Sequence, residues 1–212
     1  MGHFVKALSI SAVALITQPF FSSAALAQTQ RWKLDTAHSS AGFAVRHMMV
    51  SNVRGRFPKL TGNAEYDGKD IKSINVEAVI DTSSIDTGDD KRDEHLRGED
   101  FFNIKKFPQM KFVSKKTEKA GKGHFKLIGD LTLCGITKPV TLDVEGPSDA
   151  VEAMGKTRVG ASATTTINRK DFGITYGGLL DNGGAVVSDD VKVTLDIELV
   201  KQEKAEEKAS AK

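Results

Sequence analysis

Residues 83–114 read SSIDTGDDKRDEHLRGEDFFNIKKFPQMKFVS and differ in pattern from the sequence on either side. The stretch from Asp89 to Leu96 is rich in charge and contains no β-branched residue, which favours a short helix over a strand. Thr87 or Asp89 supplies an N-cap oxygen, and Gly98 follows as a C-cap. The sequence therefore predicts one short helix here.

Four phenylalanines follow this helix within a few residues, namely Phe101, Phe102, Phe107 and Phe112. Pro108 lies among them, and it excludes a continuing helix and predicts the entry to a new strand. A charged helix followed by a Phe-rich turn predicts a lid or plug on a β structure. The alternative is a loop that only seals one end of the core, because aromatic side chains more often pack than bind.

Outside this segment, apolar and polar residues alternate with period two, which is typical of half-buried strands. The clearest cases are residues 41–48, 73–81, 125–133, 140–145, 159–167 and 191–199. Three further segments, Trp32–Asp35, Gly55–Tyr66 and Gln109–Lys116, bring the expected number of strands to about eight or nine. Short connections favour an antiparallel meander. No amphipathic helix is long enough to cover a sheet, so the sheet must close on itself or pack on a second sheet.

The expected inward face mixes small and large side chains. Gly129 and Ala163 are small, whereas Phe43 and Phe57 are large. An eight-stranded barrel is either filled by its side chains or holds one small ligand. Small inward residues favour a cavity, but a neighbouring ring can also fill the space they leave.

The two ends of the chain differ from the middle. Residues 1–27 combine an apolar run with Ala25-Leu26-Ala27 before Gln28, which predicts a cleaved secretory signal peptide and export to the periplasm. Its apolar core is too short to span a membrane. Residues 28–200 form the expected barrel domain. Residues 201–212 are charged and lack apolar periodicity, so we expect a flexible tail.

Composition and motifs exclude several classes of function. Lys and Arg number 30 against 28 Asp and Glu, with no basic block, so a nucleic-acid partner is not expected. Cys134 is the only cysteine, which excludes a disulfide framework and favours a small, partly buried filler. Phosphate-loop, zinc-site and nucleophile-elbow patterns are absent from the sequence. No metal ligands and no catalytic residues are predicted.

Some polar residues still allow an alternative reading as an enzyme. The acid/base candidates are His47, Asp93 and His95, or Arg169 with Asp171. Arg169 ends an apolar strand, where it would meet a polar ligand head or a carboxylate, or tie the barrel rim to a neighbouring loop.

Between the first two strands, Asp35, His38 and Ser39 are expected to satisfy turn backbone. This assigns them a local structural role.

The chain closely resembles the YceI-like family of exported bacterial proteins. The resemblance rests on LDTAHSSAGFAVRHM, VRGRF, SIDTGDDKRDEHLRGEDFFNIKKFPQMKF, GDLTLCGITKPVTL, INRKDFGI and VSDDVKVTLDIEL, in this order, and runs from about Trp32 to Leu199. It implies an all-β fold: a closed, antiparallel, lipocalin-like β-barrel of about eight strands with a short helix near one end. It also implies a hydrophobic pore that holds a polyisoprenoid, an isoprenoid quinone or a similar long amphiphile.

The expected function is therefore binding or carriage of a long-chain apolar lipid, without chemistry on the lipid and without a cofactor. An enzyme acting on such a lipid, or a fully packed envelope protein acting by surface contact, are the alternatives. A homodimer is left open. The candidate pore-lining residues are Phe43, Val45, His47, Phe57, Ile80, Phe102, Phe107, Met110, Phe112, Leu131, Leu142, Ala163, Ile167, Arg169, Phe172 and Val193.

Overall fold

The structure is a computed structural model that describes residues 1, 29–181 and 183–203. The predicted signal peptide and residues 204–212 of the predicted tail lie outside these residues. The strands are β1 (Gln30–Leu34), β2 (Ser40–His47), β3 (Ser51–Phe57), β4 (Leu60–Tyr66), β5 (Asn75–Asp81), β6 (Gln109–Gly121), β7 (His124–Leu133), β8 (Ile136–Glu145), β9 (Val151–Ala153), β10 (Lys156–Asn168) and β11 (Val187–Lys201). The helices are α1 (Asp90–Arg97) and the 3₁₀ turns η1 (Ile71–Ser73), η2 (Thr82–Ser84) and η3 (Arg169–Phe172).

Eight of these strands close into an antiparallel barrel, as predicted. The ring runs β11, β1, β4, β5, β6, β7, β8 and β10, and the pairing of β10 with β11 closes it. That seam is long, extending from Arg158 opposite Val200 to Asn168 opposite Asp190. Each strand of the ring pairs with both of its neighbours, although the β8–β10 pairing covers only residues 143–145 and 162–164.

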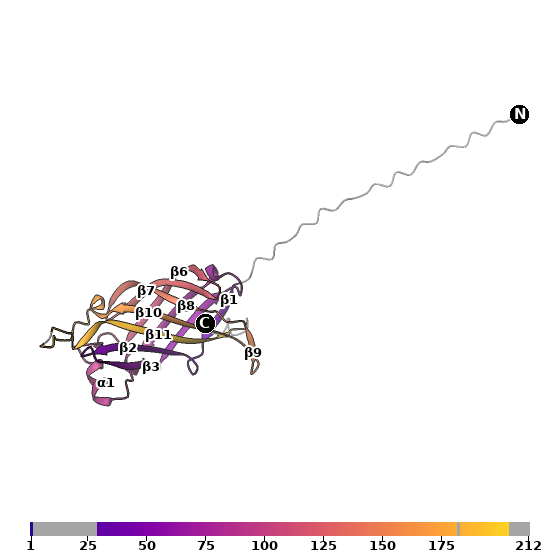
Figure 1. The fold of residues 1–212 in the computed structure, drawn as a ribbon. Coiled ribbons are helices and arrows are strands. Elements are labelled where there is room, and N and C mark those ends of the chain that lie inside the picture. Colours follow the sequence, from indigo (N-terminus) through magenta and orange to yellow (C-terminus); the bar gives the residue numbers. More distant parts are fainter. Residues whose placement is uncertain (2–28, 182, 204–212) are drawn as a thin grey trace.

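Three short strands lie outside the ring. The β2–β3 hairpin pairs with the first part of β11, and β1 pairs with its last part. Strand β9 extends β10 at the opposite end. The barrel is therefore elongated, with α1 and the β2–β3 turn at one end and β9 at the other (Figure 1). We call these the helix end and the β9 end.

The predicted helix is confirmed, and its caps explain its limits. Asp89 is the N-cap, and its side chain accepts a hydrogen bond from the Arg92 N–H at 3.0 Å. Asp93, although buried, accepts from both the Thr87 N–H at 3.0 Å and the Thr87 hydroxyl at 2.6 Å. Gly98 ends the helix, and its N–H donates to the His95 carbonyl at 3.0 Å. The charged sequence thus makes a helix whose polar groups are satisfied locally.

Two expectations about strand limits were wrong. The segment Gly55–Tyr66 is not continuous: β3 ends at Phe57 and β4 begins at Leu60, because Pro58 has no N–H to continue a ladder. The backbone between β3 and β4 pairs elsewhere: the Lys59 carbonyl accepts a hydrogen bond from the Asp81 N–H at 3.0 Å. At the C-terminus, β11 includes Lys201, which the sequence placed in the tail.

Among the described residues, no helix combines the length and the apolar character needed to cross a membrane.

Candidate functional site

An apolar cavity of about 220 Å³ lies inside the barrel. Its wall follows the period-two alternation of the strands, so that every second side chain points inward. Strand β7 contributes Phe125, Leu127 and Leu131, and β8 contributes Val140, Leu142 and Val144. The surface that the cavity exposes is wholly apolar. Such a space favours apolar groups and offers no partner to a charged one.

Gly129 is the smallest inward residue of β7, and the space beside it is already filled. A Cβ atom placed on Gly129 would lie 2.6 Å from the Phe112 ring and 2.4 Å from the Val113 carbonyl. Phe112 therefore packs directly over Gly129. By contrast, Ala161 and Ala163 of β10 border the cavity itself.

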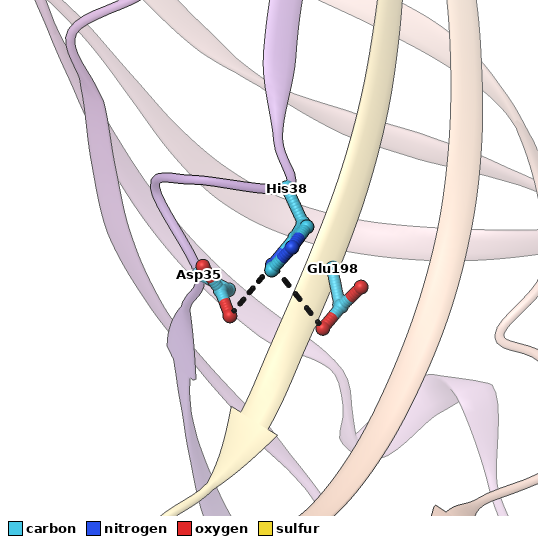
Figure 2. Close-up of side chains that lie close together, drawn as sticks. All are labelled: Asp35, His38 and Glu198. Carbon is cyan, nitrogen blue, oxygen red and sulfur yellow. Dashed lines mark ion pairs between the residues drawn. The ribbon is translucent and has the colours of Figure 1, made fainter. Parts of the chain in front are cut away.

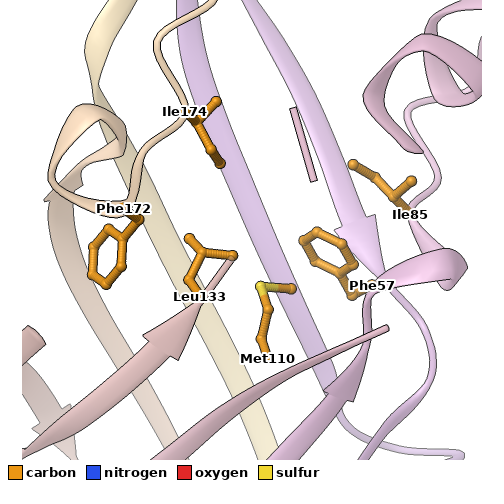
Figure 3. Close-up of a cluster of buried hydrophobic side chains, with 6 residues drawn as sticks. All are labelled: Phe57, Ile85, Met110, Leu133, Phe172 and Ile174. Carbon is orange, nitrogen blue, oxygen red and sulfur yellow. The ribbon is translucent and has the colours of Figure 1, made fainter. Parts of the chain in front are cut away.

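A cluster of buried side chains closes the barrel at the helix end. It consists of Phe57, Ile85, Met110, Leu133, Phe172 and Ile174 (Figure 3). Phe102 meets the Phe57 ring edge-on with centroids 5.6 Å apart, and Phe43 lies 5.7 Å from Phe57 on centroids. Partly buried Phe101 and Leu96 pack against the same cluster. The Phe-rich segment thus contributes to a packed plug at this end.

The β9 end of the cavity is bordered by Trp32, Tyr66, Ile74 and Pro147. Burial, and then the charges of Asp67 and Asp70, raise the pKa of Tyr66. Within the described chain, the indole Nε1 of Trp32 is one of two buried side-chain polar atoms without a hydrogen-bond partner. It does not reach the cavity surface, which is wholly apolar.

The structure brings half of the predicted pore residues together in the cavity wall. These are Ile80, Met110, Phe112, Leu131, Leu142, Ala163, Ile167 and Val193. The wall also contains residues that were not chosen from the sequence, among them Trp32, Leu34, Leu60 and Tyr66. Trp32 and Leu34 alternate with Lys33 in a segment that was already expected to be a strand, so the same periodicity could have found them.

The other predicted pore residues lie elsewhere. Phe57 and Phe172 belong to the plug, and Phe43 and Phe102 pack against it. Phe107 covers Gly135, and the Lys106 ammonium lies 5.2 Å from its ring centroid.

Val45 and His47 are in the β2–β3 hairpin, opposite Val191 and Val187 of β11, and neither lines the cavity. They follow Phe43 on the same face of β2, nearer to the β2–β3 turn.

Arg169 is buried and holds neighbouring backbone segments together. This agrees with the expectation that it ties the barrel rim to a neighbouring loop. Its Nη1 donates to the carbonyls of Ile174 at 2.8 Å and Tyr176 at 2.6 Å, and its Nε donates to the Ser188 carbonyl at 2.9 Å. Nη2 lies 3.2 Å from Oδ1 of Asp189. The guanidinium thus ties both ends of the segment between η3 and β11 to the rim, and its donors are already used.

The remaining acid/base candidates lie away from the cavity. Asp93 accepts hydrogen bonds from Thr87, as described above. The His95 Nε2 lies 3.0 Å from Asp100 Oδ2, and its ring meets Phe101 and Tyr176 edge-on. Asp171 is exposed in η3. None of these residues lines the cavity.

Cys134 shows no sign of thiolate chemistry. Its Sγ lies 3.6 Å from the Phe101 carbonyl and 3.8 Å from the Phe102 carbonyl. Burial raises the pKa of the Cys134 thiol to about 11, so the thiol stays protonated at neutral pH.

A polar cluster at the β1–β2 corner contains Asp35, His38 and Glu198 (Figure 2). His38 Nδ1 lies 3.1 Å from Asp35 Oδ2 and 3.9 Å from Glu198 Oε1. Arg158 bridges the two carboxylates, with Nη1 2.8 Å from Asp35. Asp35 also accepts from the Ala37 N–H at 3.0 Å, which is the turn role expected from the sequence. Because the Arg158 guanidinium bonds to both carboxylates, the cluster works as an ionic tie between the turn after β1, β10 and β11.

A closed eight-stranded barrel around an apolar cavity defines a small binding barrel of the lipocalin-like type. The family model described as the YceI-like domain matches residues 32–199, so the chain belongs to the YceI-like family.

Individual relatives agree with this assignment. The chain is 39% identical over 166 residues to a "UPF0312 protein" of Shewanella denitrificans, covering 78% of this chain and 84% of that protein. BcnA of Burkholderia cenocepacia is similar in structure, with a TM-score of 0.67 and 24% identity over 78% of this chain and 98% of BcnA.

A polyisoprenoid binding domain from Saccharophagus degradans, implicated in plant cell wall breakdown, has a TM-score of 0.61 and 18% identity. The match covers 81% of this chain and 98% of that domain. At these identities the two structures support the fold alone.

Proposed function

We propose that this protein binds and carries a long apolar lipid, such as a polyisoprenoid or an isoprenoid quinone, inside the barrel. The observation that carries the proposal is the cavity inside the barrel with a wholly apolar surface. Each methylene group that leaves water for such a surface gains about 0.8 kcal/mol. Affinity for a hydrocarbon chain therefore needs no specific polar contact.

Cavity size and family membership both support a lipid ligand. An apolar cavity of about 150 Å³ is enough to take up benzene, and this cavity is larger, at about 220 Å³. The Saccharophagus degradans domain of the same fold is described as polyisoprenoid binding. A carrier role without catalysis is consistent with the positions of the acid/base candidates, because none of them lines the cavity.

The proposed location is the periplasm. It is supported by residues 1–27, whose apolar run and small-residue cleavage pattern are typical of a signal peptide. We expect the mature protein released by osmotic shock to begin at Gln28. Intact-mass measurement tests this, and a released protein that still starts at Met1 would contradict it.

The function is tested by mass spectrometry of organic extracts from the purified protein, with wild type compared against Ala163→Phe. Ala163 borders the cavity, so a phenyl ring there should fill it and lower the bound lipid at least several-fold. Thr164→Phe is the matched control, because Thr164 is the exposed neighbour on the same strand. A wild-type extract without lipid, or equal lipid in both variants with intact β-rich circular dichroism, would refute the proposal.

A further inference from the structure

Two loops at the helix end build an exposed apolar projection. The β2–β3 turn exposes Met48, Met49 and Val50, with exposed fractions of 44%, 52% and 76%. The segment before β11 adds Tyr176 at 44% and Leu179 at 79%. We call these five residues the apolar tip. None of them lines the cavity or belongs to the buried plug.

Backbone hydrogen bonds join the two loops into one surface. The Met48 N–H donates to the Val186 carbonyl at 2.8 Å, and the Val186 N–H donates to the Gly178 carbonyl at 3.0 Å. Leu179 pairs with Ala185 in an isolated bridge. The two loops are therefore connected, and the loop before β11 projects beyond the barrel at the end where β2 ends (Figure 1).

The β2–β3 turn is built from residues that turn geometry disfavours. Met48 and Met49 both have positive φ, 50° and 61°, and the Val50 N–H donates to the His47 carbonyl at 3.1 Å. A turn with two such central residues strongly prefers Asn-Gly. Here the same positions hold two large apolar side chains, and both are exposed. Local stability alone would not select these residues.

Cationic side chains flank the tip on the outer face of the hairpin. Arg46 Nη2 donates to the Met49 carbonyl at 2.9 Å, which places a guanidinium at the base of the turn. Arg54 and Lys192 lie on either side of Ala44, two residues from Arg46 on the same face. Acidic residues also lie at this end. They are Asp189, which pairs with Arg169 and Lys170, the exposed Asp181 and Asp190, and the exposed Asp100, which pairs with His95 beside Tyr176.

We propose that the apolar tip docks the protein on a phospholipid bilayer, with Met48, Met49, Val50 and Leu179 inserted and Arg46 and Arg54 at the anionic head groups. Apolar side chains with cations at their base suit the interface between acyl chains and head groups. A specific protein interface uses about 20–30 residues on each side, far more than this projection offers. The proposal rests on the proposed function, because a carrier of a membrane lipid must meet a membrane to exchange it.

Docking at the tip would bring the plug end of the barrel toward the bilayer. Tyr176 joins the two features, since its ring packs on His95 and on Phe101, which in turn packs on the plug. Insertion of the tip therefore acts on residues that cover the plug.

The test is co-sedimentation of the purified protein with vesicles of phosphatidylethanolamine and phosphatidylglycerol, and with phosphatidylcholine vesicles. The variant combines Met48→Asn with Met49→Gly, which removes two apolar side chains while giving the turn its preferred sequence. We expect vesicle partitioning to fall roughly tenfold or more, without loss of thermal stability. The matched control combines Val151→Ser with Met154→Ser, which removes exposed apolar side chains from the β9 end and should leave partitioning unchanged.

A second variant tests the role of charge. Arg54→Gln should weaken binding to the anionic vesicles several-fold and leave binding to phosphatidylcholine vesicles unchanged, and added salt should reduce this difference. Equal weakening of binding to both kinds of vesicle would show that the cations do not contact anionic head groups.

Three outcomes would overturn the proposal. The first is a wild-type protein that does not bind vesicles although its extract contains lipid, which would leave the proposed function standing without this docking site. The second is equal weakening of binding by the tip and β9-end variants. The third is a dimer in sedimentation that the tip variant abolishes, which would show that a second copy covers the tip. An extract without lipid tests the proposed function alone, independently of vesicle binding.

Discussion

Gly129 and Ala163 show how two small inward residues acquire different roles. Both lie in strands that face the interior, but the Phe112 ring fills the space beside Gly129, whereas Ala163 borders the cavity. Sequence alternation predicts that both point inward. It cannot predict which gap a ring fills, because that depends on the pairing of β6 with β7 and on the rotamer of Phe112.

We expect Gly129→Ala to lower the free energy of unfolding by about 1–3 kcal/mol, because the new Cβ must displace the Phe112 ring and meets the Val113 carbonyl. Gly42→Ala is the matched control. Gly42 is also in a strand, but a Cβ there meets its nearest atoms at 3.6 and 3.8 Å, which is ordinary contact. Urea unfolding of the delipidated proteins measures both. Equal stability of the two variants would show that Phe112 moves without cost.

Arg169 marks the limit of residue-level prediction. The sequence placed it at the end of a strand and allowed either a ligand contact or a rim tie. Its partners, the carbonyls of Ile174, Tyr176 and Ser188, come from a segment that has no periodicity of its own. Only the closed fold places these carbonyls around one guanidinium.

At the scale of elements, local signals predict most of what is observed. The charged stretch predicted α1 with its cap residue Asp89, and Pro108 correctly precedes β6. Pro58 was a comparable signal, and overlooking it merged β3 with β4. The division of the Phe-rich segment between plug and wall was not predictable. Phe102 packs on Phe57 and Phe112 lines the cavity, and both follow from long-range contacts.

The difference between plug and cavity wall predicts opposite effects for two Phe→Ala substitutions, one at each place. Phe172 is 2% exposed within the plug, so Phe172→Ala should cost about 3–5 kcal/mol of stability and leave lipid affinity nearly unchanged. Phe112 lines the cavity, so Phe112→Ala should cost the delipidated protein less and weaken lipid binding more. Thermal unfolding after delipidation and fluorescence displacement of a lipid probe measure the two quantities. The reverse ranking would place Phe112 in the structural core and Phe172 in the binding site.

At the scale of the whole molecule, the barrel depends on a seam that joins distant parts of the chain. Asp35 follows β1, Arg158 lies in β10 and Glu198 in β11, and the guanidinium bonds both carboxylates. Closure was predictable from the absence of a covering helix and from the family resemblance. The ionic tie was not predictable, because Asp35 and Arg158 are far apart in sequence and are brought together by the pairing of β11 with both β1 and β10.

The seam predicts an acid-dependent loss of stability. Hydrogen bonds from Arg158, and then from His38, hold the pKa of Asp35 well below its usual value of about 3.9. A carboxylate with a depressed pKa in the folded state stabilises the fold fully above about pH 3.9 and loses that contribution as the pH falls toward the folded value.

We therefore expect the unfolding free energy of wild type to fall more steeply below about pH 4 than that of Asp35→Asn, which has no proton to gain at this position. Arg158→Gln should also make the unfolding free energy fall less steeply at acid pH, because Asp35 then loses the partner that lowers its pKa. The two changes remove the same interaction, so the double variant should show much less than the sum of the single effects. Urea unfolding at a series of pH values from about 7 to about 2 measures all four proteins. Parallel pH profiles for wild type and Asp35→Asn would mean that the Asp35–Arg158 tie contributes equally to the folded and unfolded chains. Closure of the barrel would then depend on the β10–β11 ladder and the packed interior without this ionic tie.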